Sequence, residues 1–331
     1  MYRELYELQR KQGRALRAVG ISGPCAGKSC IFQEGKARAF VGEEKDFPSF
    51  QELFGGAMKT GLVKNGEDVW FTEALFSQPH LVILGAGHVS VPTAKLGKLL
   101  GYHVTVMDDR EEFANRERFP EVDEVILGDF EEIPDRIPPY ENTYYVIVTR
   151  GHMGDSLCAR KLLNRPYAYM GMIGSRSKAA LAKKALLEEG FSQEQVDSIH
   201  SPIGLPIGGQ LPEEIGVSIL AEIVQEKNRH YADYCDQAVA DRILEGAKGV
   251  MVTIVGKEGS SPRGVGSKML VEEDGRTTGS VGGGRVEYEA ICRCAQVREW
   301  ALEKYKLYTG KEAANLGMVC GGTVELLFER I

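Results

Sequence analysis

Short apolar runs alternate with amphipathic segments through the middle of the chain. Five apolar runs have the length of buried strands, and they are His80–Leu84, His103–Met107, Val125–Leu127, Tyr144–Thr149 and Ala168–Ile173. Helical spacing of apolar residues predicts helices over Val89–Leu100, Asp155–Leu163, Ser177–Glu189 and Pro212–Lys227. Strands that alternate with helices are typical of an α/β protein with a parallel sheet. We therefore expect a Rossmann-type domain over residues 79–229.

The C-terminal part, residues 230–331, is predicted to be a smaller α+β lobe. Its pattern predicts a helix over Asp233–Glu245 and strands over Val250–Val255, Lys268–Glu272 and Val324–Phe328. A second helix is predicted where apolar residues recur at steps of three and four, at Ile291, Cys294, Val297, Ala301 and Tyr305.

The N-terminal part, residues 1–78, resembles a degenerate copy of the C-terminal part. Ala26–Gly35 aligns without gaps with Gly266–Gly275, so that Lys28 matches Lys268. The first copy lacks the glycine-rich loops of the second. We infer an internal duplication and expect the two terminal segments to pack together beside the central sheet.

Composition limits the classes of protein to which the chain can belong. It has 331 residues, of which 43% are hydrophobic and 26% charged, which is typical of a globular protein of about two domains. The net charge of −7 and the lack of a basic tail argue against binding to nucleic acid. No apolar run is long enough for a membrane span or a signal peptide, so we expect a cytoplasmic protein. Seven scattered cysteines without a CxxC pair predict neither disulfides nor a structural zinc site.

A glycine turn follows the first central strand, at Gly85-Ala-Gly-His-Val-Ser90. Small residues between a strand and a helix let a pyrophosphate approach the helix N-terminus. Asp108, at the end of the next strand, has the spacing of a ribose-binding acid and favours NAD over NADP, although Arg110 weakens that preference. We expect Gly85, Gly87, His88 and Asp108 to bind NAD(P), the alternative being that the glycines serve only close packing.

Two polar loops follow later strands of the predicted sheet. In Thr149–Asp155, His152 and Asp155 are candidates for an acid/base pair or metal ligands, and Asp155 is the better candidate for a helix cap. The amides, Arg176 and Lys178 of the Ile173–Lys178 loop suit an anion, the alternative being helix capping by its serines.

Two further loops, Gly259–Gly266 and Gly279–Gly284, are rich in glycine and serine. Their backbone amides, hydroxyl groups and one arginine resemble a cradle for a phosphate or a pterin. Either loop alone is also typical of tight turns in a small β structure. The candidate contacts are Ser261, Arg263, Gly282, Gly283 and Gly284.

Cys320-Gly321-Gly322 precedes the last predicted strand. A cysteine before two glycines can expose its sulfur beside backbone amides, which lowers a thiol pKa and suits a soft metal or a sulfur donor. The alternative is a small buried residue, the commoner fate of a cysteine.

These motifs together resemble the xanthine dehydrogenase accessory factor family, XdhC/CoxI. The resemblance covers nearly the whole chain. It is most specific at Leu81–His88, Met107–Arg110, Tyr169–Arg176, Ser201–Gly208, Pro212–Ile215, Ile219–Ile223, Gly259–Arg263, Gly279–Gly284 and Cys320–Gly322.

The resemblance implies a maturation factor for molybdenum hydroxylases. Members bind the molybdenum cofactor (molybdopterin), protect it, favour its sulfurated form and help to insert it into the apoenzyme. It also implies a homodimer and a cysteine desulfurase as a further partner. Cys320 is then the candidate cofactor and metal contact, with Gly321 and Gly322 beside it and the two glycine loops lining the site.

The chain departs from the family pattern in three ways. The intact Cys-Gly-Gly part follows the Rossmann-type part, whereas family members usually have the reverse order. Arg285 stands where many members have cysteine after the triple glycine, and Met318-Val319 where some have Gln-Cys. Fewer sulfur ligands weaken the case for direct coordination of molybdenum, and Arg285 can instead meet a phosphate.

Two other functions compete with cofactor delivery. An NAD(P)-dependent oxidoreductase would use the glycine turn and Asp108 for the cofactor, with His152 as acid/base. A nucleotide-sensing scaffold would let NAD change the affinity for the pterin without consuming NAD.

Overall fold

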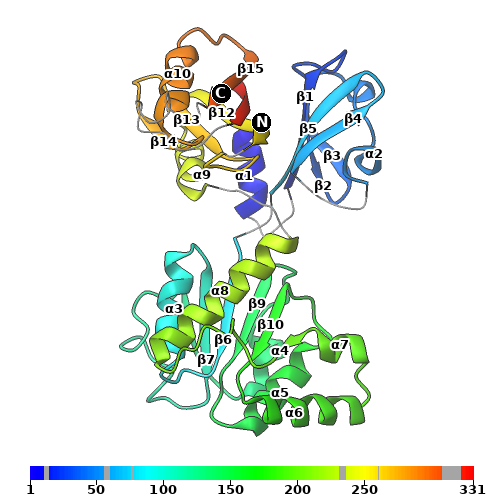
Figure 1. The fold of residues 1–331 in the computed structure, drawn as a ribbon. Helices are drawn as coiled ribbons and strands as arrows, with labels where there is room; N and C mark the ends of the chain where they lie inside the picture. The colour runs from blue at the N-terminus through cyan, green and yellow to red at the C-terminus, as the bar shows by residue number, and fades with distance from the viewer. Residues whose placement is uncertain (11–14, 56–59, 76–77, 231–235, 260, 308–321) are drawn as a thin grey trace. The chain divides into compact units, whose positions relative to one another are not determined.

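The computed structural model describes residues 1–331 except 11–14, 56–59, 76–77, 231–235, 260 and 308–321 (Figure 1). Its contacts divide the chain into two compact units. The terminal unit joins Met1–Ser77 to Ala232–Ile331, and the central unit is Gln78–Tyr231. Both ends of the chain therefore build one unit, and the central unit is inserted between its two halves.

The central unit contains a parallel sheet with the strand order β11-β10-β9-β6-β7-β8. The strands are β6 (His80–Leu84), β7 (His103–Asp108), β8 (Glu124–Leu127), β9 (Thr143–Ile147), β10 (Tyr169–Met172) and β11 (Ile199–His200). The order reverses at β6, so that β6 and β9 flank a topological switch point. The predicted Rossmann-type sheet is confirmed.

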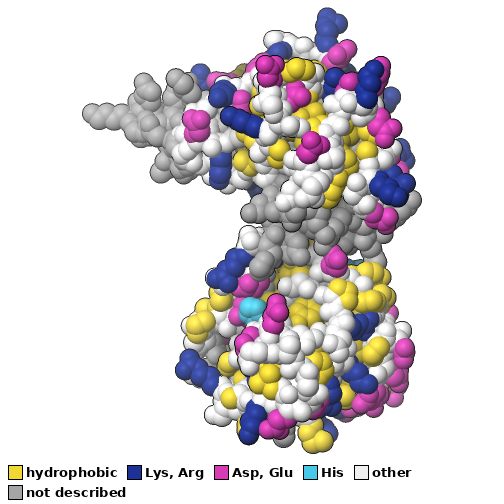
Figure 2. Space-filling model, turned by 90° about the vertical axis from the view of Figure 1, so that its right-hand side faces the viewer, with side chains coloured by type: hydrophobic (Ala, Val, Ile, Leu, Met, Phe, Trp, Pro, Cys, Tyr) yellow, Lys and Arg dark blue, Asp and Glu magenta, His cyan; other side chains and the backbone are white. Residues whose placement is uncertain are grey.

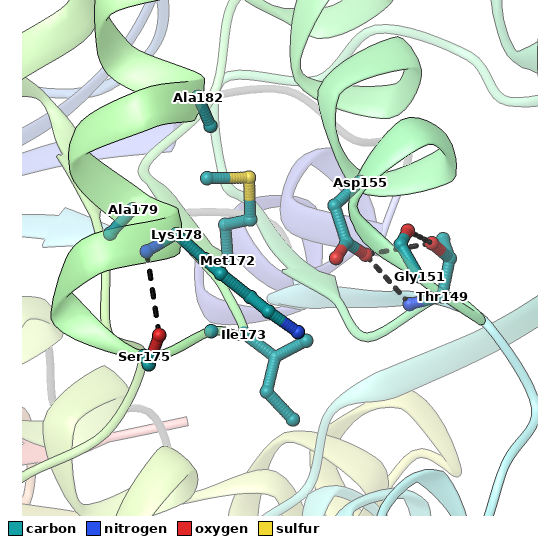
Figure 3. Close-up of a pocket in the computed structure, with 10 residues that line it drawn as sticks. Thr149, Gly151, Asp155, Met172, Ile173, Ser175, Lys178, Ala179 and Ala182 are labelled. Carbon is teal, nitrogen blue, oxygen red and sulfur yellow. Dashed lines mark hydrogen bonds between the residues drawn. The ribbon is translucent and has the colours of Figure 1, made fainter.

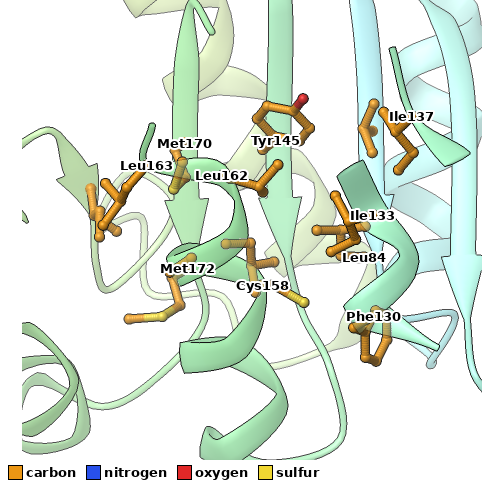
Figure 4. Packing of buried hydrophobic residues seen from close by; sticks show 14 of the residues in the cluster. Leu84, Phe130, Ile133, Ile137, Tyr145, Cys158, Leu162, Leu163, Met170 and Met172 are labelled. Carbon is orange, nitrogen blue, oxygen red and sulfur yellow. The ribbon is translucent and has the colours of Figure 1, made fainter. Parts of the chain in front are cut away.

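Helices cover both faces of this sheet because side chains of a buried strand point alternately to either side. Val82 and Leu84 join the core beneath α4 (Ile133–Arg136), α5 (His152–Leu162), α6 (Arg176–Glu188) and α7 (Gln193–Asp197), shown in Figure 4. Leu81 and Ile83 join the opposite core beneath α3 (Ser90–Leu99) and α8 (Pro212–His230). Among the described residues, none of the helices has both the length and the apolarity required to cross a membrane.

The terminal unit contains two antiparallel sheets of equivalent topology, β3-β2-β1-β5-β4 and β14-β13-β12-β16-β15. The N-terminal sheet consists of β1 (Ala15–Ser22), β2 (Ser29–Gln33), β3 (Lys36–Val41), β4 (Gly61–Asn65) and β5 (Asp68–Leu75). The C-terminal sheet consists of β12 (Gly249–Gly259), β13 (Lys268–Glu272), β14 (Thr277–Gly279), β15 (Trp300–Leu307) and β16 (Gly322–Arg330). A helix precedes each sheet, α1 (Tyr2–Arg10) and α9 (Gln237–Leu244). The shared topology supports the internal duplication.

A β-bulge marks the same position in both central strands. The pairing shifts between Gly20 and Ser22 in β1, and between Ile254 and Gly256 in β12. A bulge adds one residue to one strand and increases its bend, so it is a reliable marker of register. Matching the two bulges makes β1 and β12 equivalent residue by residue.

This match corrects the alignment expected from the sequence. Val19 pairs with Ser29, and the equivalent Thr253 pairs with Lys268. Ser29, rather than Lys28, therefore occupies the position of Lys268, and the gap-free alignment is wrong by one residue along β2. The hairpin that follows closes over two residues in the N-terminal half and three in the C-terminal half, which restores the expected match at the next glycine.

The two halves pack against each other through equivalent faces. Ile31 and its counterpart Leu270 share one buried cluster, which also joins α1 to α9. Phe71 and its counterpart Leu327 share a second cluster, and all four side chains are fully buried. The sheets thus cover each other's apolar faces as a two-fold dimer interface would, within one chain.

A network of buried charges lies between the two sheets. Arg17 of β1 is 1% exposed and forms ion pairs with Glu329 of β16 and, at 3.6 Å, with Glu73 of β5. Glu73 also pairs with Lys268 of β13, which is 1% exposed. The Tyr2 hydroxyl donates to Glu329 at 2.5 Å. The two cations balance the two carboxylates, which a buried network requires.

The second predicted helix of the C-terminal lobe is wrong beyond its first eleven residues. Helix α10 runs from Gly284 to Cys294, and Trp300–Leu307 forms strand β15 instead. Ala301 and Tyr305 are four residues apart, a spacing that fits both a helix turn and one face of a strand. Their pairing with β16 decides in favour of the strand.

Candidate functional site

The predicted dinucleotide turn lies between β6 and α3, at the switch point of the central sheet. Gly85 has φ +102°, and a Cβ there would lie 2.4 Å from the Val148 carbonyl oxygen, so close packing requires this glycine. A Cβ on Gly87 would meet nothing within 4 Å. Helix α3 begins without a side-chain cap, and the Ser90 hydroxyl donates instead to the Gly85 carbonyl at 2.6 Å. The open backbone at Gly87 and the uncapped helix therefore fit a phosphate group. His88 is exposed beside them.

Asp108 is not presented openly to a ribose in this structure. Its carboxylate is 1% exposed and accepts hydrogen bonds from the Ala86 amide at 2.7 Å and the Arg110 side chain at 2.8 and 2.9 Å. Burial alone would raise the pKa of Asp108, but the Arg110 guanidinium and the two amides outweigh it and lower the pKa. Asp108 therefore remains ionised and fixes the glycine turn to the end of β7.

A cationic cluster, of which the sequence analysis identified only Arg110, lies beside this acid. The Arg110 guanidinium lies 3.9 Å from the centre of the Phe113 ring, and that of Arg118 lies 5.0 Å from it. Arg118 also donates to the Ala86 carbonyl at 3.4 Å. The spacing of Arg110, Phe113 and Arg118 in the sequence does not predict this cluster. The three side chains come together only because the loop after β7 folds back to the glycine turn.

A cavity of 240 Å³ opens beside the carboxyl ends of β9 and β10, between α5 and α6 (Figure 3). Asp155 lies in its wall and accepts from the Thr149 amide at 3.0 Å and hydroxyl at 2.7 Å. On the opposite wall, the Lys178 side chain extends from α6 across the pocket. The structure thus brings the two predicted polar loops into one cavity, and the glycine turn adjoins it, since a Cβ on Gly85 would approach Thr149.

Capping explains part of these loops. Ser175 caps α6 by accepting from the Lys178 amide at 3.4 Å, as the structural alternative predicted. Asp155 is not the N-cap of α5, since Gly151 holds that position. It stabilises the preceding loop through Thr149 instead. The side chain of His152 lies outside the described residues.

The described residues of three predicted motifs of the C-terminal lobe meet at one end of their sheet. Gly259, at the start of the first glycine loop, pairs with Gly322 at the start of β16. Pro262 of the same loop lies next to Gly282, where a Cβ would approach it to 3.2 Å. Cys320 and Gly321 lie outside the described residues.

The second glycine loop presents backbone to its surroundings. Glu287 of α10 accepts from the Ser280 hydroxyl at 2.6 Å and the Val281 amide at 2.9 Å, which holds the loop closed at its base. Gly283 is the N-cap of α10, provides no side-chain cap, and would place a Cβ in open space. Gly284, with φ +62°, begins the helix.

The first glycine loop contributes side chains to the same end of the sheet. The Ser261 hydroxyl is buried without a hydrogen-bond partner among the described residues. Arg263 is half-buried. These groups fit a pterin that carries a phosphate. The buried Ser261 hydroxyl and the open backbone at Gly283 can hydrogen-bond such a molecule, and the half-buried Arg263 guanidinium can pair with its phosphate.

Comparisons with known proteins agree with these two parts of the chain. Residues 81–223 match the XdhC Rossmann domain, and residues 243–305 match the XdhC and CoxI family. YqeB of Escherichia coli (strain K12), described as uncharacterized, is 32% identical over 196 residues, which are 56% of this chain and 36% of that protein. A protein of Bacillus subtilis (strain 168), described as a probable xanthine dehydrogenase subunit, is 30% identical over 159 residues, 48% of this chain and 46% of that protein.

The chain thus spans about a third to a half of the length of these curated relatives. A solved structure described as a xanthine dehydrogenase from Bacillus halodurans shares the fold. It has a TM-score of 0.55 at 21% identity, and the match covers 68% of this chain and 66% of that one. The first match covers most of the central unit, and the second lies in the C-terminal half of the terminal unit, in the order that the motifs predicted. The chain belongs to the XdhC and CoxI family of xanthine dehydrogenase accessory factors.

Proposed function

We propose that this protein is a maturation factor that binds molybdenum cofactor and delivers it to a xanthine dehydrogenase-like or aldehyde oxidoreductase-like molybdenum hydroxylase. Family membership and the similarity to a protein described as part of a xanthine dehydrogenase support this role. The observation that carries the proposal is the meeting of the two glycine loops and the start of β16 at one end of the C-terminal sheet.

Each group in this site has a role suited to its chemistry. Arg263 pairs with the phosphate of the pterin, because a guanidinium binds phosphate oxygens bidentately. The Ser261 hydroxyl and the backbone at Gly283 hydrogen-bond the ring system or the phosphate. Cys320 supplies a thiolate at the molybdenum end, since soft sulfur ligands suit soft metals.

Equilibrium binding of molybdenum cofactor to the purified protein, under anaerobic and reducing conditions, tests this proposal. We expect stoichiometric binding by the wild type and at least a tenfold loss of affinity in Cys320→Ala. Cys292→Ala is the matched control, because Cys292 is an exposed free thiol outside the three motifs. Failure of the wild type to bind, or equal affinity in both variants, would contradict a site at Cys320.

The phosphate contact has its own matched pair of variants. Arg263→Met should weaken binding about tenfold, the value of roughly 1.4 kcal/mol for a lost charge-assisted contact. Arg276→Met should leave it unchanged, because Arg276 is exposed in a hairpin and lies 3.6 Å from Asp274. Loaded protein should then activate a molybdenum hydroxylase apoenzyme. Sulfuration by a cysteine desulfurase and homodimerisation remain predictions, to be tested by desulfurase pull-down and by light scattering.

Nucleotide binding by the central unit is a second candidate function, supported by the Arg110 cluster. Two guanidinium groups lie at the end of β7, where a Rossmann-type sheet holds the adenosine ribose, and Arg110 already covers Asp108. We therefore expect NADP to bind more tightly than NAD, contrary to the preference expected from Asp108 alone. Arg110→Met should cost about tenfold in NADP affinity and little in NAD affinity, measured by equilibrium dialysis.

Two readouts separate the roles of such a nucleotide. An oxidoreductase consumes NADPH with some small substrate, whereas a sensor changes the affinity for the pterin without consumption. Titrating molybdenum cofactor with and without NADPH, while following the absorbance of the reduced nicotinamide, distinguishes them.

A further inference from the structure

A second cavity, of 360 Å³, lies inside the terminal unit and belongs to neither site described above. Its walls come from both halves of the duplication. Arg17 and Ser29 line it from β1 and β2 of the N-terminal half, and Trp300 and Glu329 line it from β15 and β16 of the C-terminal half. Tyr2 of α1 completes the inner wall.

The cavity arises from a difference between equivalent positions. In the C-terminal half, Lys268 fills its position with a long side chain that reaches Glu73. In the N-terminal half, the same position is Ser29, which is much shorter. The cation comes instead from Arg17, whose counterpart is Met251, and it reaches Glu329 from the neighbouring strand. In the N-terminal half the cation thus lies on β1, as Arg17, and not on β2. The space beside Ser29, which a lysine side chain would occupy, is left unfilled.

The polar groups around this space favour a neutral occupant. Of the charged side chains that line it, Arg17 and Glu329 pair with each other, and Arg298, Glu299 and Arg330 are exposed to solvent, so a buried ion would add an uncompensated charge. The Nε atom of Arg17 is buried and has no hydrogen-bond partner among the described residues. An acceptor atom on a bound molecule would satisfy it.

Aromatic side chains favour a flat occupant. The Trp300 indole is 38% exposed and its Nε1 edge lies against Gly27, where a Cβ would approach to 2.5 Å. Gly27 has φ +80°, so the backbone there suits glycine for two independent reasons. On the inner side, the Arg17 guanidinium lies over the Tyr2 ring at 4.4 Å. Indole and guanidinium planes both stack on heteroaromatic rings.

We propose that this cavity is a binding site for a neutral, fused heteroaromatic ring with hydrogen-bond acceptors, of the pterin or purine class. The ring lies between Trp300 and the Ser29 wall, and accepts a hydrogen bond from Arg17. The site is separate from the glycine loops of the C-terminal half, and it does not depend on the molybdenum role proposed above. It gives the degenerate half a binding function that its lost loops do not supply.

Fluorescence titration tests the site directly, because the chain has only two tryptophans and Trp70 is fully buried. The probes are 6-hydroxymethylpterin, guanosine and adenosine, added separately. We expect at least one of them to quench Trp300 with saturation, and calorimetry to confirm one equivalent bound. Saturation with the pterin alone assigns the site to pterins, and saturation with a nucleoside assigns it to purines. No saturable binding of any probe would overturn the proposal.

Two variants close the cavity in different ways. Ser29→Leu fills it without touching the ion pairs, and should reduce probe affinity at least tenfold. The double variant Arg17→Met with Ser29→Lys copies the arrangement of the other half and keeps the net charge, so it should fold and also lose binding. Arg276→Met is the control for affinity. Wild-type affinity in both cavity variants, with unchanged thermal unfolding, would place the probe elsewhere and overturn the proposal.

Discussion

The two halves of the terminal unit share a topology and differ in almost everything attached to it. Both have five strands in the same order and a bulge at the same place. The helix against the outer face is α10, of eleven residues, in the C-terminal half, and only α2 (Phe50–Phe54) in the N-terminal half. The N-terminal half also lacks the glycine loops. The comparison shows that the apolar pattern of the strands maintains the sheet, whereas loops can be lost without losing it.

Each half has its own way of fixing the loop before its second strand. In the N-terminal half, the Cys25 amide donates to Asp68 at 2.8 Å, and Lys28 pairs with Asp46 at 3.0 Å. In the C-terminal half, the Lys268 ammonium donates to the Gly266 carbonyl of the preceding loop at 3.3 Å and also pairs with Glu73 across the interface. The loop of the degenerate half is thus fixed within its own half, whereas that of the C-terminal half is connected to the interface.

The largest expected effect comes from removing Arg17, the cation that replaces Lys268 in the N-terminal half. Arg17→Met leaves Glu329 buried without its cation, and we expect a loss of about 3–5 kcal/mol in the free energy of unfolding. Adding Ser29→Lys should restore most of that loss, because the new ammonium occupies the position of Lys268. Urea unfolding of the three proteins measures both effects. A single variant as stable as the wild type would show that the network contributes nothing.

Equivalent apolar positions should respond alike. Phe71→Ala and Leu327→Ala each remove a fully buried side chain from the same interface cluster, so we expect losses of about 3–5 and 2–5 kcal/mol. Both should unfold the terminal unit as a whole. Leu62→Ala, at a side chain 48% exposed, serves as the control and should change stability by less than about 0.5 kcal/mol. A large loss in only one of the two buried variants would argue against a shared interface.

Thiol chemistry should distinguish buried cysteines from the exposed Cys292, with a smaller effect. Burial and the neighbouring Asp68 raise the pKa of Cys25 to about 11, and burial raises that of Cys30 to about 12. Both stay protonated at neutral pH, so alkylation should be slow and should accelerate about tenfold per pH unit between pH 7 and 9. Exposed Cys292 should react first among the described cysteines, as followed by mass spectrometry. Rapid labelling of Cys25 at pH 7 would contradict a purely structural thiol.

The smallest effects should come from the hairpin glycines. Gly35 and Gly275 have φ +73° and +86°, so alanine at either position costs about 1 kcal/mol of left-handed strain. Equal losses in thermal unfolding would confirm that the two hairpins remain equivalent despite their different lengths. Gly61→Ala, in open space at a strand start, should cause no loss.

Prediction from the sequence succeeds best where the spacing of apolar residues fits only one type of secondary structure. The continuous apolar runs before Gly85 and Asp108 predict β6 and β7 almost to the residue, because strands buried on both faces leave no other interpretation. Helix α8 is likewise predicted from its first residue, Pro212. The glycine turn is placed correctly for the same reason, since it connects two well-marked elements.

Prediction fails where two interpretations fit the same residues. Tyr305 satisfies both helical and strand spacing, so β15 is missed. The sequence alignment of the two halves matches Lys28 with Lys268, because it maximises identical residues without a gap. The sequence does not show that the two hairpins differ in length by one residue, which makes Ser29 the true counterpart of Lys268. The role of Arg110 could not be predicted for another reason. The sequence shows that Arg110 is two residues from Asp108, but it does not show that Asp108 is buried and therefore pairs with the arginine.

The insertion of the central unit between two mutually dependent halves has a consequence during synthesis on the ribosome. About 150 residues separate the end of the first half from the start of the second. At roughly 5–20 residues per second, about 8–30 seconds pass before synthesis of the second half begins. During that time the face that carries Ile31 and Phe71 is uncovered, while the central unit has all it needs to fold alone. This apolar face is therefore exposed to aggregation until the C-terminal half is made, and β16, the last strand of that half, supplies the Leu327 side chain that packs against Phe71.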